Sequence, residues 1–333
     1  MNSDSTPILF LSSSEVKTLL PMGECIELMT KALADLSRGK FHLPLRMIVR
    51  PPDAEGLMAM MPAYRNSERR AYGLKALCFF HSNPALNKDA HQGCVLLSSG
   101  DTGELLAIMN ASAITALRTA AVSAVATQLL ARKDACTLAI IGAGVQARQH
   151  LVALSHLRPI KHARVFSPNP KHPSQLVHEM KDLLAFPIEA AASAEEALKD
   201  ADLIVTATSS REPVVQRRWI PEGAHINAIG TYSPQSREID GQTMAASRIF
   251  VDRYESAINE AGDYLLAVAE EAIGHDSIVA EVGEVLLGEN PGRTSDKEIT
   301  LFKSLGLAIE DMACAEYLYE KAKTEKAGTW LEF

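Results

Sequence analysis

One hexapeptide, Gly142-Ala143-Gly144-Val145-Gln146-Ala147, constrains the fold of this chain more than any other segment. It fits the pattern G-x-G-x-x-A, it follows the apolar run Thr137–Ile141, and a segment that predicts a helix continues from it to Leu157. In such a strand–turn–helix unit the first glycine permits a tight turn, the second lets the backbone approach a pyrophosphate, and a small third residue lets helix and strand pack closely. The helix N-terminus offers N–H groups to the phosphates. The hexapeptide therefore predicts a dinucleotide-binding turn, the alternative being an incidental turn.

The segment that follows this turn alternates between strand-like and helix-like stretches. Short, unbroken apolar runs recur at Ala163–Phe166, Leu203–Thr206, His225–Ile229 and Ile249–Val251. Parallel strands buried on both faces have this character, and their alternation with helices is typical of a doubly wound sheet. We therefore predict a Rossmann domain here.

The first third of the chain has a different pattern. Ser12–Ser14 can cap a helix that runs toward Lys40, and β-like runs follow at Met47–Val49, Leu57–Met61, Leu74–Phe80, Cys94–Leu97 and Leu105–Met109. The turn-forming segment Ser98–Gly103 joins the last two runs as a hairpin, which predicts a mixed, partly antiparallel sheet. Near the other end, Ile299–Lys321 predicts one long amphipathic helix that could pack back onto this part.

The fold class is therefore α/β: a Rossmann doubly wound domain plus a mixed α+β domain for substrate binding and dimerisation. A chain of 333 residues is long enough for two domains. We expect the first domain to be discontinuous, residues 1–120 with 305–333, and the Rossmann domain to be residues 121–304. The net charge of −8, without a block of Lys or Arg, argues against nucleic acid or an anionic membrane as a partner.

Three features favour a cytoplasmic protein. The five cysteines are scattered and form no C-x-x-C pair, which predicts reduced thiols and no zinc site. The polar start Met1–Pro7 does not predict a signal peptide. The stretch Leu105–Ala131 carries one charge, but polar residues recur nearly once per turn, so it predicts a buried helix rather than a membrane span.

Two cations lie in surroundings where charge is costly. Arg118 is the single charge of the stretch just described, so it needs an anionic partner: a ligand carboxylate or phosphate, or a remote Asp or Glu. Lys75 lies within a strand-like apolar run, where it could anchor a carboxylate or move a proton, or else point to solvent from a strand edge. Arg46, which precedes a short strand, would by itself be an ordinary surface arginine.

The loop after the second predicted strand of the Rossmann domain indicates which cofactor is preferred. NAD-selective sites usually carry an acid about 20 residues beyond the glycine motif, whereas this loop contains Ser167, Asn169 and Lys171 and no acid. These side chains could accept a 2′-phosphate, which favours NADPH over NADH; alternatively, they form a simple proline-rich loop. The histidines show no H-E-x-x-H spacing and no G-x-S-x-G motif is present, so metal and hydrolase sites are not predicted.

Taken together, these landmarks resemble the ornithine cyclodeaminase/mu-crystallin family over roughly Ser12 to Lys321. The order and spacing of the following segments carry the resemblance: Leu43-Pro44-Leu45-Arg46, Met60-Met61-Pro62-Ala63, Gly73-Leu74-Lys75, Thr115-Ala116-Leu117-Arg118-Thr119-Ala120-Ala121, the glycine turn, Asn227-Ala228-Ile229-Gly230, and Thr300-Leu301-Phe302-Lys303-Ser304-Leu305-Gly306-Leu307-Ala308-Ile309-Glu310-Asp311.

The resemblance implies a homodimer, with a first domain that is completed by the C-terminal helix. It implies that Arg46, Lys75 and Arg118 carry the catalysis and hold the substrate carboxylate near the nicotinamide, with Leu305 also at the substrate. The cofactor would be lined by His91, Arg118, Thr119, the Gly142–Gln146 turn, Thr208, Ala228, Ile229, Gly230 and Ser304.

One departure from the family pattern narrows the activity. Ornithine cyclodeaminases carry Gly-Gly-Asp-x-Pro-Gly-Lys after the Asn-Ala-Val strand, whereas this chain has Gly230-Thr231-Tyr232. Tyr232 stands where their proton-handling Asp would be, so the segment looks more like members that reduce cyclic ketimines. We expect reduction of 1-pyrroline-2-carboxylate or 1-piperideine-2-carboxylate with NADPH or NADH. The alternatives are an ornithine cyclodeaminase, an amino-acid dehydrogenase, or an NADPH-bound, crystallin-like binding protein.

Overall fold

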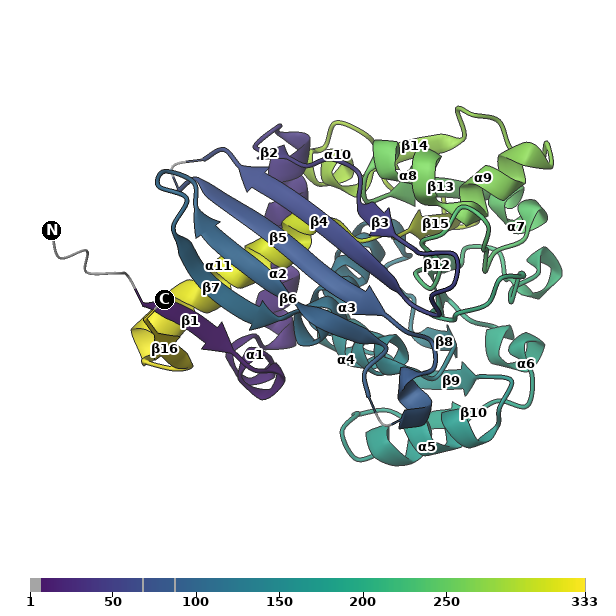
Figure 1. Ribbon diagram of the computed structural model, residues 1–333. Coiled ribbons are helices and arrows are strands. Elements are labelled where there is room, and N and C mark those ends of the chain that lie inside the picture. The colour runs from purple at the N-terminus through teal and green to yellow at the C-terminus, as the bar shows by residue number, and fades with distance from the viewer. Residues whose placement is uncertain (1–6, 68, 87, 333) are drawn as a thin grey trace, which may run out of the picture. The chain divides into compact units, whose positions relative to one another are not determined.

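The computed structural model describes residues 7–67, 69–86 and 88–332 (Figure 1). The chain divides into two compact units: unit 1 is Met1–Arg118 with Leu307–Phe333, and unit 2 is Thr119–Gly306. The segment Met1–Pro7, which does not predict a signal peptide, lies outside the described residues except for Pro7.

Unit 1 contains a mixed sheet with the strand order β16-β1-β7-β6-β5-β4-β2, and β3 also pairs with β4. Its strands are β1 (Ile8–Leu11), β2 (Phe41–His42), β3 (Met47–Val49), β4 (Leu57–Arg65), β5 (Ala71–Phe79), β6 (His91–Ser99), β7 (Leu105–Asn110) and β16 (Thr329–Leu331). The predicted hairpin is confirmed, since β6 and β7 pair antiparallel. The pairing of β1 with β7 is parallel.

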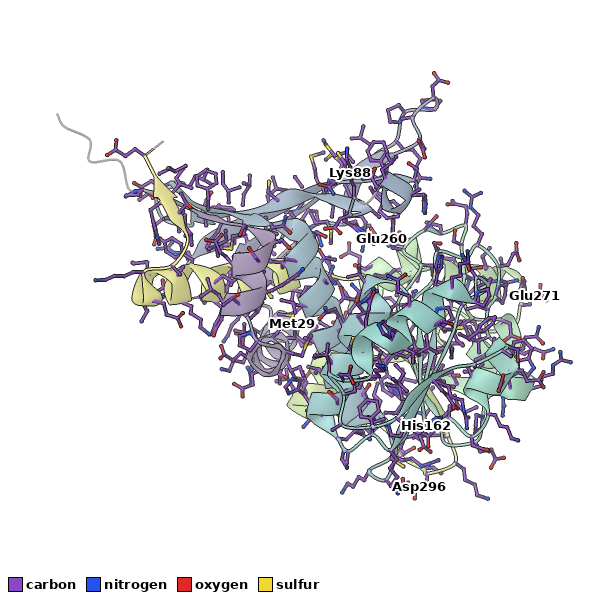
Figure 2. The ribbon with its side chains drawn as sticks, turned by 90° about the horizontal axis from the view of Figure 1, so that it is seen from below. Met29, Lys88, His162, Glu260, Glu271 and Asp296 are labelled. Carbon is purple, nitrogen blue, oxygen red and sulfur yellow. The ribbon has the colours of Figure 1, made fainter. Side chains whose placement is uncertain are left out.

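The helices of unit 1 include α1 (Ser13–Leu19), α2 (Met22–Ser37), the 3₁₀ turn η1 (Asn83–Leu86) and α11 (Ala308–Glu325). Figure 2 shows α2, marked by Met29, and α11 on one face of the sheet. Ser12 caps α1 as predicted, in a capping box with Glu15. The expectation of one helix as far as Lys40 is wrong, because the chain breaks at Leu20 and Pro21, and proline cannot donate the backbone hydrogen bond that a helix interior requires.

Unit 2 is built on an all-parallel sheet with the order β10-β9-β8-β11-β12-β15-β13-β14. Its strands are β8 (Thr137–Ile141), β9 (His162–Phe166), β10 (Ile188–Ala190), β11 (Leu203–Thr206), β12 (His225–Ala228), β13 (Ser247–Val251), β14 (Ile278–Glu281) and β15 (Ile299–Lys303). The strand order reverses between β8 and β11, which is where doubly wound folds bind their ligands. The predicted Rossmann architecture is confirmed.

The helical segments of unit 2 connect these strands. They are α4 (Val145–Leu157), α5 (Lys171–Met180), α6 (Ala194–Leu198), η2 (Arg217–Trp219), α7 (Gly241–Ala246), α8 (Tyr254–Glu260), α9 (Gly262–Ala269) and α10 (Val282–Leu287). The prediction of a single helix over Ile299–Lys321 is wrong. Ile299–Lys303 is instead the strand β15, buried throughout between β12 and β13, and Gly306, with φ +76°, precedes α11. A short apolar run fits a buried strand as well as a helix face, so periodicity alone could not separate them.

The apolar stretch Leu105–Ala131 forms β7 and then the helix α3 (Ala111–Leu130). By length and composition α3 could cross a membrane, but 83% of its most apolar window is buried within the structure. This burial is typical of a core helix, in agreement with the prediction.

Candidate active site

The close packing of α11 on β5 positions Lys75. Residues of β5 alternate between the two faces of the sheet, and Lys75 is on the buried face with 3% of its surface exposed. Gly73 is on the same face, and a Cβ added to it would lie 2.9 Å from the Cβ of Met312. The glycine therefore lets α11 approach the strand, and Oδ2 of Asp311 lies 2.7 Å from Nζ of Lys75.

Arg118 shares this carboxylate and has a second one. Its Nε lies 3.3 Å from Oδ1 of Asp311, and its Nη1 lies 2.7 Å from Oε2 of Glu310. Both acids are in the first turn of α11, where the helix dipole favours negative charge. Of the two kinds of partner considered for Arg118, the structure provides remote carboxylates. Two buried cations are thus compensated by two buried carboxylates, an arrangement that we call the charge cluster: Lys75, Arg118, Glu310 and Asp311.

The charge cluster shifts the pKa of its cations in opposite directions. Burial lowers the pKa of Lys75 to about 8, with Arg118 and Arg46 acting in the same direction and Asp311 opposing them. Burial alone would lower the pKa of Arg118, but Asp311 and Glu310 together raise it above that of ordinary arginine. Arg118 is therefore a permanent cation, whereas Lys75 can change its protonation state close to neutral pH.

Arg46 and His91 belong to the same electrostatic environment. The charge of Arg46 acts on Lys75. Burial, together with the charges of Lys75 and Arg118, lowers the pKa of His91 to about 4, so its imidazole is neutral at pH 7. Unit 1 therefore brings together Arg46, Lys75, His91 and Arg118, which are far apart in the sequence.

The glycine turn of unit 2 has the geometry that a dinucleotide requires. Gly142 has φ +116°, and a Cβ on it would lie 2.4 Å from the carbonyl oxygen of Ala207. Gly144 is the N-cap of α4, where no side chain caps the helix, and a Cβ on it would meet no atom within 4 Å. The helix N-terminus thus faces open space with its N–H groups uncapped by a side chain, as phosphate binding demands. Ala143, the half-exposed Val145 and Gln146 complete the turn.

Most of the other predicted cofactor residues lie along the same edge of the parallel sheet. The N–H of Ile229 donates to the carbonyl of Thr206, and the N–H of Ser304 donates to that of Ala228, at 2.9 and 3.1 Å. Thr208 and Gly230 both donate their N–H groups to Glu238. This edge is formed by the carboxyl ends of β8, β11, β12 and β15, which is where doubly wound sheets bind their ligands.

The remaining predicted residues of unit 2 are Leu305, Thr119 and three residues that follow the carboxyl end of β9, at the same edge of the parallel sheet. The side chain of Leu305 belongs to the hydrophobic core of unit 2, and its N–H donates to Asp252 at 2.6 Å. Thr119 is buried at the start of unit 2. Ser167, Asn169 and Lys171 follow β9, and Oδ1 of Asn169 accepts the N–H of Lys171 at 3.1 Å.

The first acid after the glycine motif has a structural partner. Glu179 is ion-paired with Arg148 of α4. Among the described residues, no group of three or more His, Cys, Asp or Glu side chains is placed to hold a metal ion.

Comparison with known proteins identifies the family. Residues 8–326 match the ornithine cyclodeaminase/mu-crystallin family. The chain belongs to this family. The Delta(1)-pyrroline-2-carboxylate reductase of Bacillus cereus is 35% identical over 98% of this chain and 100% of its own length.

Two solved structures of the family are also similar. The Thermococcus litoralis Delta(1)-pyrroline-2-carboxylate reductase in complex with NADH and L-proline is 40% identical, has a TM-score of 0.93, and the match covers 97% of this chain and 99% of that one. An archaeal alanine dehydrogenase dimer with bound NAD is 34% identical, with a TM-score of 0.92 and coverage of 98% and 99%.

Three carboxylates that lie beside predicted site residues were not predicted from the sequence: Glu310, Asp311 and Glu238. The first two were part of the segment that carried the family resemblance, and acids at a helix start are a recognisable pattern. What the sequence could not indicate is that they are buried beside cations from β5 and α3.

Proposed function

We propose that this protein reduces a cyclic imino acid, Δ1-pyrroline-2-carboxylate or Δ1-piperideine-2-carboxylate, to L-proline or L-pipecolate with a reduced nicotinamide cofactor. The observation that carries the proposal is the charge cluster, in a chain 40% identical to a reductase solved with NADH and L-proline. In this proposal unit 1 binds the substrate and unit 2 the cofactor, which matches the domain roles predicted from the sequence.

The residues of unit 1 have complementary roles in this reaction. Arg46 and Arg118 would bind the substrate carboxylate; because Nε and Nη1 of Arg118 already face Asp311 and Glu310, we assign Nη2 to the substrate. Lys75, with its pKa of about 8, would hold the substrate and keep the imine nitrogen protonated. A protonated imine carbon is electrophilic, and the bound reduced nicotinamide supplies the hydride that it accepts.

We further propose that NADPH is preferred over NADH. The loop at the end of β9, which contains Ser167, Asn169 and Lys171, carries no acid. The nearest following acid, Glu179, is paired with Arg148. A carboxylate at this position would repel a 2′-phosphate, whereas Lys171 would attract it. The Thermococcus litoralis structure holds NADH, so the ratio of kcat/KM for the two cofactors is the measurement that decides this point.

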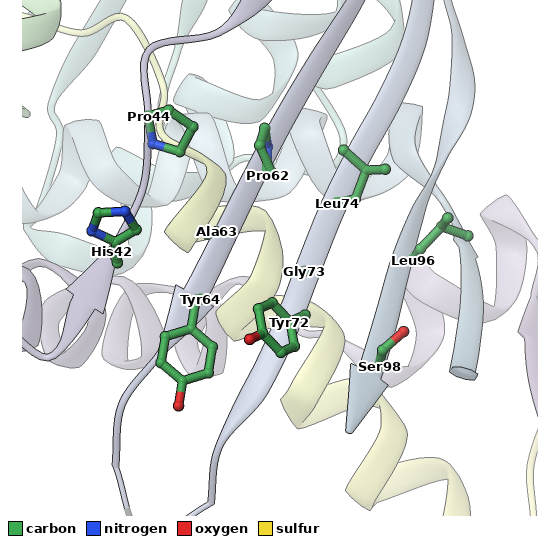
Figure 3. A pocket seen from close by; sticks show the side chains of 10 residues that line it. All are labelled: His42, Pro44, Pro62, Ala63, Tyr64, Tyr72, Gly73, Leu74, Leu96 and Ser98. Atoms are coloured by element: carbon green, nitrogen blue, oxygen red, sulfur yellow. The ribbon is translucent and has the colours of Figure 1, made fainter. Parts of the chain in front are cut away.

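The outer face of the unit 1 sheet supports the proposal of a homodimer. Met47, Met58 and Tyr72 are 60%, 43% and 53% exposed on it. A hollow of about 380 Å³ is lined by His42, Pro44, Pro62, Ala63, Tyr64, Tyr72, Gly73, Leu74, Leu96 and Ser98, with α11 behind the strands (Figure 3). A second copy is the occupant that we propose, given the dimer found for the archaeal alanine dehydrogenase. Light scattering should give twice the chain mass for the wild type and the monomer mass for Leu74→Glu.

A second candidate is reductive amination of an acyclic keto acid, favoured by the similarity to the archaeal alanine dehydrogenase. It would need the same carboxylate binding, with ammonia as co-substrate. The cytoplasmic location also remains part of the proposal, and it is supported by the five cysteines, none of which forms a disulfide.

One experiment separates these functions. The protein is assayed with Δ1-pyrroline-2-carboxylate, Δ1-piperideine-2-carboxylate, and pyruvate with ammonia, each with NADPH and NADH, by nicotinamide absorbance; ornithine is followed by ammonia release. We expect the cyclic imino acids to have the highest kcat/KM. Turnover of pyruvate and ammonia alone would favour the amino-acid dehydrogenase. Ammonia release from ornithine would favour the cyclodeaminase, and binding of NADPH with no turnover would favour a crystallin-like role.

A further inference from the structure

Glu238 is a buried carboxylate in unit 2 for which the proposed reaction has no use. Its side chain is completely buried in the segment between β12 and α7. Three donors converge on it: the hydroxyl of Thr206 and the N–H of Gly230 on Oε2, at 2.8 and 2.7 Å, and the N–H of Thr208 on Oε1 at 2.6 Å. These donors come from the ends of two adjacent strands, β11 and β12.

The two backbone donors lie beyond the last ladder bond between those strands, in which Ile229 donates to Thr206. A buried N–H without a partner is costly, so a carboxylate that accepts from both sides links the loop after β11 to the loop after β12. Space is tight here, since a Cβ on Gly230 would lie 2.5 Å from Oε1 of Glu238 and 2.2 Å from the carbonyl oxygen of Thr208. The spacing of the two loops is therefore set by this one side chain.

A second carboxylate holds Glu238 in place. Oδ1 of Asp263 accepts the backbone N–H groups of Glu238 and Ile239, at 2.7 and 2.9 Å. Its Oδ2 accepts the hydroxyl of Thr231 and lies 2.9 Å from Nζ of Lys303. Lys303 is the last residue of β15, so the network ties a third strand end to the other two.

The linked loops border the predicted cofactor site. Thr208 and Gly230 are predicted to line the cofactor, and Ala207 is the residue that Gly142 of the glycine turn closely approaches. We propose that Glu238 is a positioning residue for the nicotinamide dinucleotide: it does not touch the cofactor but sets the spacing of the strand ends on which the cofactor lies. This inference rests on the proposed function, in that it requires the cofactor to bind at this edge of unit 2.

The test compares a variant of Glu238 with a variant of a carboxylate at the opposite end of the parallel sheet. In Glu238→Gln the amide has one oxygen for three donors, and its NH₂ must face an N–H or hydroxyl donor. Glu298→Gln is the matched control, because Glu298 also accepts backbone N–H groups, those of Thr294 and Ser295, in the loop before β15, at the opposite end of that strand. Thr206→Val is a milder variant that removes one fully buried donor and leaves the carboxylate.

The measurements are the Kd of NADPH by fluorescence titration, the KM of each substrate, and the melting temperature without ligand. We expect Glu238→Gln to raise the Kd of NADPH and its KM at least about tenfold and Thr206→Val at least about threefold, since hydrogen bonds to charged groups are among the stronger ones. Glu298→Gln should lower the melting temperature and leave the Kd within about twofold. The KM of the imino acid should change little in all three variants.

A Kd for Glu238→Gln within twofold of the wild type overturns the inference, even if its melting temperature falls. If that variant does not fold, Thr206→Val decides by the same criterion. Failure of the proposed function is a separate result: wild-type protein that binds NADPH and reduces none of the imino acids refutes the activity and leaves the role of Glu238 to be judged by these titrations. Wild-type protein that binds neither NADPH nor NADH refutes both.

Discussion

Asp311, in the first turn of α11, places its carboxylate 2.7 Å from the ammonium of Lys75 in β5. The same carboxylate lies 3.3 Å from Arg118, so a single acid holds the two buried cations that the sequence predicted for the substrate site. The site of unit 1 is therefore a compensated charge cluster in which one acid links the two cations.

Loss of the Asp311 charge should disable the site. In Asp311→Asn, Lys75 and Arg118 lose their shared counterion, and we expect kcat/KM to fall at least about 100-fold, a loss of about 2.7 kcal/mol in transition-state stabilisation. Removing one partner of a buried ion pair also costs about 3–5 kcal/mol of stability, which denaturant unfolding would measure. Glu320→Gln, on the exposed side of the same helix and paired with Arg69, is the control. An Asp311→Asn enzyme within threefold of the wild type would contradict this role.

Truncation of the two cations should have different effects on folding. Lys75→Ala and Arg118→Ala should both abolish turnover. The Lys75→Ala protein should remain folded, because Asp311 keeps Arg118 as a partner. Arg118→Ala leaves Glu310 and Asp311 buried near one lysine, so it should also unfold more easily. The double variant Arg118→Ala/Glu310→Gln removes one positive and one negative charge. It should recover stability and remain inactive; recovery of turnover would rule out Arg118 as a substrate ligand.

The pH dependence of kcat/KM should report the titration of Lys75. Its pKa is lowered to about 8, and the proposed reaction needs its ammonium form. Log kcat/KM should therefore be level below about pH 8 and decline above it, approaching one unit per pH unit. In Lys75→Arg this decline should disappear up to about pH 10, since arginine stays charged. A wild-type profile that is flat to pH 10 would show that Lys75 does not titrate in the reaction.

Glu316 should make stability depend on pH. Burial raises its pKa to about 7, although Arg65 and Arg69 oppose the shift, and Oε1 of Glu316 lies 2.8 Å from Arg65. Because the pKa in the folded state is above the unfolded value, protonation favours the fold: the contribution is complete below about pH 4.5 and is lost as the pH rises through about 7. The loss is at most about 3 kcal/mol. Unfolding free energies at pH 5 and 8 should differ more for the wild type than for Glu316→Gln; an equal difference would contradict the assignment.

Alanine substitutions at the two glycines of the turn should affect different properties of the protein. Gly142→Ala requires a side chain at φ +116° and 2.4 Å from the carbonyl oxygen of Ala207, so it should lower the melting temperature without any ligand. Gly144→Ala meets no protein atom within 4 Å, so its melting temperature should be unchanged while the Kd of NADPH rises at least about tenfold, because the methyl group occupies the space of the pyrophosphate. Tight NADPH binding by Gly144→Ala would place the dinucleotide elsewhere.

The sequence by itself determined the features that depend on local interactions. The glycine turn, the buried strand β8 before it and the helix α4 after it are specified by neighbouring residues. The hairpin of β6 and β7 is specified by its turn residues, and the cap of α1 by Ser12. Lys75 and Arg118 were recognisable because a charge within an apolar segment is costly wherever that segment lies.

Only the tertiary structure decided what these residues meet. Arg118 and Asp311 are 193 positions apart in the sequence, and Glu238 and Thr206 are 32 positions apart, so no local pattern links the members of either pair. The strand β15 could not be told from a helix by its composition, because its identity comes from pairing with β12 and β13. The physical reason is the same in each case. The sequence requires that a charge or an apolar run be buried, but the partner that offsets the cost of burying it comes from packing between distant segments.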